Sequence, residues 1–185
     1  MKLTTRARRF TVAITGTAAA AGLAIGMSTL AQAAPASRAA PSITPVCQTH
    51  GLVIWLNTNG SGTAGTTFYR LNFTNLSGHA CTLEGFPFVT AVNLSGHQVG
   101  NRAIFNHIHP VHVVTLGRGK TVRALLGVRH TANFPASKCH PVTAAGFRVF
   151  PPTGVSAGSK LVPFPFSACS TRGAHAPNFL SIGPV

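Results

Sequence analysis

Acidic residues are almost absent from this chain. Its 185 residues include one Glu, Glu84, and no Asp, against 15 Lys and Arg. This shortage excludes several kinds of site in their usual form. Glycoside hydrolysis uses a pair of carboxylates, a Ser-His-Asp triad needs an acidic third member, and calcium or magnesium sites need several anionic oxygens. The composition therefore favours a protein that is not an enzyme, and we expect no cofactor.

Sequence typical of long helices is also lacking. Gly (19 residues) and Pro (13 residues) together fill about one position in six, which disfavours long helices. Hydrophobic residues nevertheless make up 45% of the chain, enough for a packed core. The combination favours an all-β domain built from short strands.

The first 33 residues have the three parts of an export signal. Basic residues stand at positions 2, 6, 8 and 9, an Ala-rich apolar stretch covers 10–30, and an Ala-x-Ala pattern ends at Ala33. We expect cleavage between Ala33 and Ala34. A membrane anchor fits less well because Gly and Thr interrupt the apolar stretch. The Arg8–Arg9 pair leaves the twin-arginine route open beside the general export route.

Removal of this signal would leave a basic, secreted protein. Eleven of the fifteen basic residues and the single acid remain, so the net charge becomes +10. Residues 34–46 are rich in Pro, Ala and Ser and read as a flexible linker. We expect residues 47–185 to form a single extracellular domain with no membrane span.

Four cysteines follow the signal: Cys47, Cys81, Cys139 and Cys169. An even number in an exported chain predicts two disulfides, for which three pairings are possible. We expect Cys47 to pair with Cys81 and Cys139 with Cys169, each closing a loop worth up to about 4 kcal/mol. A zinc site is the alternative, but no two cysteines have the Cys-x-x-Cys spacing.

Short apolar runs predict about eight strands. In 67–75, the side chains of Tyr69, Leu71 and Phe73 alternate with polar ones, as in a half-buried strand. Other strands are expected at 52–57, 88–94, 111–116, 121–128, 147–150, 161–166 and 179–182, with a turn or loop over 59–62. Pro163 and Pro165 would confine the strand 161–166 to a sheet edge or an irregular segment. The pattern favours an immunoglobulin-like antiparallel β-sandwich, with a small barrel as the alternative. Trp55, Tyr69 and the phenylalanines are expected to fill its core.

Several segments carry a resemblance to a known family. They are 71–75 (LNFTN), 81–87 (CTLEGFP), 116–119 (LGRG), 139–142 (CHPV) and 147–152 (FRVFPP). These segments resemble the actinobacterial secreted family catalogued as domain of unknown function 4232, and the resemblance covers 47–185. It implies an exported β-sandwich without an established activity, so no catalytic residue is implied. Two features depart from the family pattern: Phe88 follows Pro87 where Gly is usual, and acids are unusually few.

Basic residues gather in one predicted hairpin. The strands 111–116 and 121–128 flank Gly117-Arg118-Gly119, which is typical of a turn. Alternation directs Arg123 and Arg129 outward, and Arg118 and Lys120 fall in the turn. These four residues would form a stripe about 20 Å long, which suits a linear polyanion such as an anionic cell-wall polymer. No nucleic-acid motif accompanies them, so specific nucleic-acid binding is not expected.

Histidines form the densest group of potential metal ligands. On an extended segment His107 and His109 would project to one face, and His112 could supply a third ligand to copper or zinc. The alternative is that they are ordinary loop residues, since nine histidines are scattered along the chain. The lone Glu84 could act as a base, but pairing with a surface Arg is the simpler expectation.

Together these features predict a secreted, non-enzymatic binding module of the cell envelope or medium. Its basic surface would associate with an anionic cell-wall polymer, or the module would bind an extracellular protein. The alternatives are a histidine-based metal-binding protein and a secreted protease inhibitor that presents an exposed loop over 155–160.

Overall fold

Strands account for most of the regular structure. The computed structural model describes residues 43–154 and 157–185, all within one unit, 41–185. The strands are β1 (Leu52–Thr63), β2 (Thr66–Asn75), β3 (Cys81–Glu84), β4 (Phe88–Val92), β5 (Gln98–Val99), β6 (Ile104–Phe105), β7 (Val113–Leu116), β8 (Thr121–Arg129), β9 (Pro141–Phe150), β10 (Lys160–Cys169) and β11 (Leu180–Ile182). The helices are single turns: η1 (Thr49–Gly51), η2 (Thr131–Asn133) and α1 (Ala136–Cys139).

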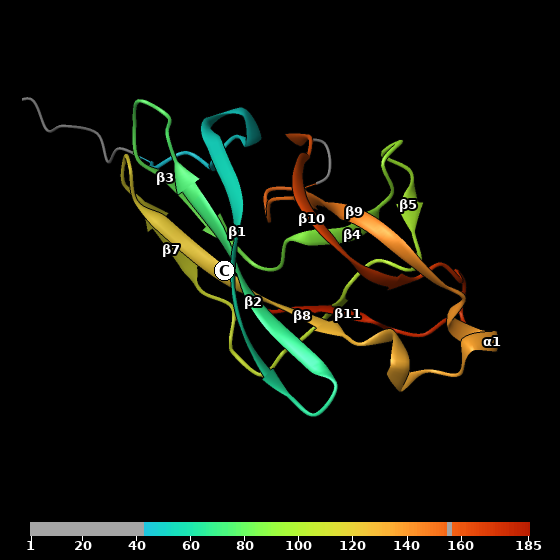
Figure 1. Cartoon of the computed structure of the whole chain (residues 1–185). Helices are drawn as coiled ribbons and strands as arrows, with labels where there is room; N and C mark the ends of the chain where they lie inside the picture. The colour runs from blue at the N-terminus through green and yellow to red at the C-terminus, as the bar shows by residue number, and fades with distance from the viewer. Residues whose placement is uncertain (1–42, 155–156) are drawn as a thin grey trace, which may run out of the picture. The chain divides into compact units, whose positions relative to one another are not determined.

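The strands form two larger sheets and a two-stranded ribbon (Figure 1). The five-stranded sheet has the order β1-β2-β8-β11-β6, the four-stranded sheet has the order β10-β9-β4-β5, and β3 pairs with β7. Neighbouring strands are antiparallel except β11 and β6. The expected all-β, antiparallel fold is confirmed. The described residues form eleven strands rather than about eight.

One core joins the sheets. It receives Leu71, Phe73 and Leu126 from the five-stranded sheet and Phe147 and Val149 from the four-stranded sheet, all fully buried. Cross-strand register explains this, because Leu71 lies opposite Ala124, whose side chain is also buried. Burial in β8 follows the predicted period of two from Thr121 to Leu126, whereas in β2 the polar Asn72 is buried between Leu71 and Phe73.

Both expected disulfides are confirmed. Cys47 is bonded to Cys81, and Cys139 is bonded to Cys169. The first bond joins the segment before η1 to β3, and all four cysteines are buried. The second bond holds the end of α1 against the end of β10.

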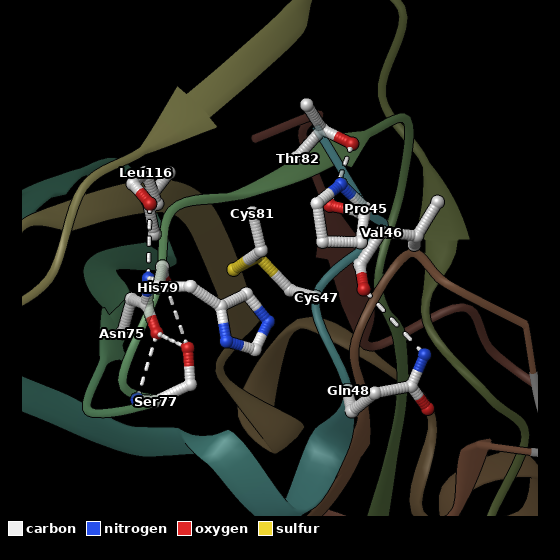
Figure 2. Close-up of a disulfide and its surroundings, with 10 residues drawn as sticks. All are labelled: Pro45, Val46, Cys47, Gln48, Asn75, Ser77, His79, Cys81, Thr82 and Leu116. Atoms are coloured by element: carbon white, nitrogen blue, oxygen red, sulfur yellow. Dashed lines mark hydrogen bonds between the residues drawn. A yellow bond between two sulfur atoms is a disulfide. The ribbon is translucent and has the colours of Figure 1, made fainter. Parts of the chain in front are cut away.

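A buried amide stands beside the first disulfide (Figure 2). Asn75, at the end of β2, is fully buried. Its Nδ2 donates to the carbonyl oxygens of His79 and Leu116, both at 2.9 Å. Its Oδ1 accepts from the backbone N–H and the hydroxyl of Ser77, at 2.9 and 2.6 Å. Asn75 thus joins the end of β2, the 76–80 turn and the end of β7.

The predicted hairpin 111–128 is wrong as a pair of hydrogen-bonded strands. β7 pairs with β3, and β8 pairs with β2 and β11. The turn 117–120 does form, since Lys120 N–H donates to Gly117 O at 3.1 Å. However, Asn75 binds this turn through its own backbone, at 3.0 Å to Lys120 O and 2.7 Å from Gly119 N. At this turn the chain passes from β7, in the two-stranded ribbon, to β8, in the five-stranded sheet.

The expected turn over 59–62 is also wrong. β1 continues to Thr63, with an irregularity in register between Asn57 and Ser61, and the chain reverses after it. Pairing with β2 overrides the local preference of Asn and Gly for turns, which explains the long hairpin of β1 and β2 in Figure 1.

β10 is an edge strand, as its prolines predict. It pairs only with β9, and the register shifts between Pro163 and Phe166. The rings of Pro163 and Pro165 are exposed, whereas Val162 is buried in the core. The prolines are tolerated because their missing N–H groups are not needed by a further strand.

Candidate functional site: a basic sheet face and its cleft

The outward side of the five-stranded sheet carries one exposed indole ring and two guanidinium groups on three successive strands. Trp55 of β1 lies opposite Asn72 of β2, and Asn72 lies opposite Arg123 of β8. In the next row Arg70 lies opposite Leu125. We call this surface the basic face and define it by Trp55, Arg70, Thr74, Thr121, Arg123 and Leu125.

Trp55 is 42% exposed, so its expected place in the core is wrong. Leu52 and Ile54 take the buried positions of β1, and the alternation turns Trp55 outward. Its indole Nε1 donates to Thr74 Oγ1 at 3.1 Å, and that hydroxyl lies 2.8 Å from Thr121 Oγ1. The indole edge is therefore fixed in the sheet while part of its ring surface remains open to a ligand.

The two arginines are diagonal neighbours on adjacent strands. Because Arg70 faces Leu125, it lies two residues out of register with Arg123, a separation of about 7–8 Å between Cα atoms. Both side chains are exposed. Asn72, which lies between Trp55 and Arg123 in the first row, is buried, and its Nδ2 donates to Arg70 O at 2.9 Å. Two guanidinium groups at this spacing can hold adjacent anionic groups.

A cleft of about 400 Å³ opens beside these arginines. Its lining includes Arg70, Arg123, His109, His112 and Leu125. The residues 183–185 close another side, and Gly183 N–H donates to Leu125 O at 2.9 Å. The cleft thus brings two of the predicted histidines, His109 and His112, together with one of the predicted basic residues, Arg123. No carboxylate side chain lines it.

A turn brings His109 to this cleft. Asn106 N–H donates to Ile182 O at 2.8 Å, and Asn106 Oδ1 accepts from Ile108 N–H at 3.1 Å. The segment 107–109 is therefore bent rather than extended, and the expected single face for His107 and His109 is wrong. The ring of His107 instead lies 4.6 Å from that of Phe86.

The structure forms no three-ligand metal site from these histidines. Among the described residues, no group of three His, Cys, Asp or Glu side chains is close enough to hold an ion. His109 and His112 line the cleft, whereas His107 packs with aromatic rings.

The remaining predicted basic residues lie outside the cleft. Arg118 and Lys120 are exposed in the turn before β8. Arg129 is exposed at the other end of β8, six residues from Arg123, or about 20 Å along the strand. The outward alternation of Arg123 and Arg129 was predicted from the sequence. Arg70 and Trp55 were missed as site residues, although the outward position of Arg70 follows from the alternation in β2.

Two further predicted features lie elsewhere. Glu84 is exposed at the end of β3, opposite Val113, and none of the described contacts pairs it with an arginine. The loop 155–160 of the inhibitor alternative includes 155 and 156, which lie outside the described residues.

The fold is a β-sandwich with two disulfides, and exposed arginine side chains lie on the outward side of its five-stranded sheet. The chain belongs to the family described as Domain of unknown function (DUF4232), which matches residues 47–185. No curated protein and no solved structure matches the chain. In the part of the chain that the structure describes, no helix is long and apolar enough to span a membrane.

Proposed function

We propose that this protein is an exported binding module that holds an anionic polymer of the cell envelope on the basic face. The observation that carries the proposal is the row of Trp55 and Arg123, with Arg70 on the adjacent diagonal. Guanidinium groups bind phosphates and carboxylates through paired hydrogen bonds. An exposed ring can stack on the apolar side of a sugar in the same polymer.

Charge supports an anionic rather than a neutral polymer. Glu84, the single acidic side chain, does not line the cleft, so no Asp or Glu side chain competes there for Arg70 and Arg123. Arg118 and Lys120 precede β8 and Arg129 ends it, which extends positive charge along the strand beyond the cleft. A linear polyanion could contact both the cleft and the ends of β8, which a small anion could not. The disulfides are consistent with an extracellular location.

The test is retention on isolated cell walls. We expect retention of the wild-type protein to fall steeply between about 50 and 200 mM salt, because polyanion contacts release counterions. Arg70→Gln with Arg123→Gln should lower retention several-fold and flatten its salt dependence. Polyphosphate and polygalacturonate as competitors would distinguish a phosphate polymer from a carboxylate polymer.

A matched control removes the same charge elsewhere. Lys138 in α1 and Arg172 after β10 are both exposed and lie near the second disulfide. Lys138→Gln with Arg172→Gln should leave retention nearly unchanged. Equal losses from both double variants would mean that net charge alone acts. Retention that is insensitive to salt would overturn the proposal.

A further inference from the structure

A second cleft, of about 610 Å³, opens between the edges of the two larger sheets. Its lining includes residues of β4, β5, β6 and the end of β9. It shares no lining residue with the cleft of the basic face. Its volume lies within the usual range for small-molecule sites, about 300–1,000 Å³.

Aromatic rings form the walls of this second cleft. Phe88, Phe105 and Phe150 all line it. The ring of Phe105 meets Phe88 edge to face with centroids 5.4 Å apart, and it stacks on Phe86 at 4.7 Å. Phe105 remains 36% exposed although its ring is held between two others. Such a fixed, exposed ring favours a planar apolar partner.

The side chain of Arg102 lies among the aromatic rings of the second cleft. The guanidinium carbon of Arg102 lies 5.5 Å from the centroid of the Phe88 ring. The attraction between the cation and the ring orients the side chain without using its N–H groups as hydrogen-bond donors to an acid. No carboxylate side chain lines the cleft, so Arg102 has no acidic competitor there. The guanidinium can therefore bind a carboxylate of a ligand.

Hydrogen bonds between side chains and backbone groups hold the segments that line this second cleft. Asn101 Nδ2 donates to Gly173 O at 2.8 Å, and its Oδ1 accepts from Gly173 N–H at 3.0 Å. Gln98 Nε2 donates to Gly100 O at 2.9 Å. The two Asn101 bonds fasten the β5–β6 connection to the loop that follows β10, and the Gln98 bond joins β5 to the start of that connection. A preformed cleft lowers the entropic cost of binding.

We infer that this second cleft binds a small monocyclic aromatic carboxylic acid. The ligand ring would pack against Phe105 and Phe88, and its carboxylate would accept hydrogen bonds from Arg102. Thr90 and Asn178 also line the cleft and offer partners for a ring hydroxyl. This site is separate from the basic face and does not depend on the polymer proposed for it.

The test is calorimetric titration with 4-hydroxybenzoate, with 4-hydroxybenzyl alcohol and glucuronate as comparison ligands. We expect the aromatic acid to bind at least about tenfold more tightly than either comparison ligand, because each of them lacks one of the two interactions. Arg102→Gln should weaken binding of the acid by about tenfold and leave that of the alcohol unchanged. Phe105→Ala should weaken both aromatic ligands.

The control variant is Lys138→Gln, which removes an equal charge from α1, outside both clefts. It should leave 4-hydroxybenzoate binding unchanged, and circular dichroism should show each variant folded. If Arg102→Gln does not fold, amide chemical-shift mapping on the wild type replaces it, with shifts expected at Arg102, Phe105 and Gly173. The inference would be overturned if 4-hydroxybenzoate did not bind at millimolar concentration, or if it bound no more tightly than the alcohol or less tightly than glucuronate. Chemical shifts confined to other residues would overturn it as well.

Discussion

The side-chain hydrogen bonds of Asn75 connect three segments of the chain. All four of its side-chain hydrogen bonds are made inside the protein, to His79, Leu116 and Ser77. We expect Asn75→Ala to lower the free energy of unfolding by about 2–4 kcal/mol, because several buried partners lose their bonds. Urea denaturation measures this loss.

Asn59→Ala serves as the control for that substitution. Asn59 is exposed on β1, so its replacement should change the free energy of unfolding by no more than about 0.5 kcal/mol. Similar losses of unfolding free energy in the two variants would show that the hydrogen bonds of the buried amide do not stabilise the fold.

Gly100 and Gly119 both have a positive φ, but only at Gly100 would a Cβ also clash with neighbouring atoms. Gly100 has a φ of 64°, and a Cβ there would lie 2.3 Å from Cys169 O. Gly119 has a φ of 73°, but its Cβ would meet nothing within 4 Å. Gly119→Ala should cost about 1 kcal/mol for the left-handed backbone alone, and Gly100→Ala should cost at least about 2 kcal/mol more. Thermal unfolding of both variants decides this, and equal shifts in Tm would contradict it.

At the scale of elements, the disulfide Cys47–Cys81 encloses the β1–β2 hairpin. Its sequence separation is 34, for which the chain-entropy model gives about 4 kcal/mol. We expect the double variant Cys47→Ala with Cys81→Ala to lose about that much stability. Cys139→Ala with Cys169→Ala, at a separation of 30, should lose nearly the same. Urea midpoints test both, and a loss below about 1 kcal/mol in either would contradict the loop-closure argument.

Alternation predicted the strands with one polar face, and it failed elsewhere for definite reasons. β2 and β8 were foreseen because Arg70 and Arg123 interrupt their apolar residues. The exposure of Trp55 was not predicted. The residues near the start of β1 are apolar on both faces of the strand, so the sequence shows no alternation there. β5 and β6 have two residues each, too few to form a pattern.

Pairing between distant strands was the least predictable feature. The glycines around Arg118 correctly marked a turn, but a turn does not decide whether its flanking strands bond to each other. Asn75, 43 residues before Arg118, binds that turn and directs β7 to β3. The cleft of the basic face likewise has His109 and Arg70 in one lining, although they are 39 residues apart in the sequence, and no local spacing encodes this.

At the scale of the whole molecule, export would remove residues that lie outside the described part. Cleavage after Ala33 would remove four of the fifteen basic residues. We therefore expect the protein from the culture medium to begin at Ala34 and to lack free thiols. Intact mass and amino-terminal sequencing test this. A full-length chain in the medium, or a start within the domain beyond Cys47, would contradict the predicted signal.

The prolines of β10 also bear on how the protein behaves when many copies are present. Every open sheet edge is a potential template for a strand of another molecule. Pro163 and Pro165 stand with exposed rings on the edge strand of the four-stranded sheet and supply no N–H to a newcomer. They interrupt the ladder beside the exposed Leu161, whose side chain would otherwise favour stacking of copies. An edge strand interrupted in this way is a poor template for the pairing of copies.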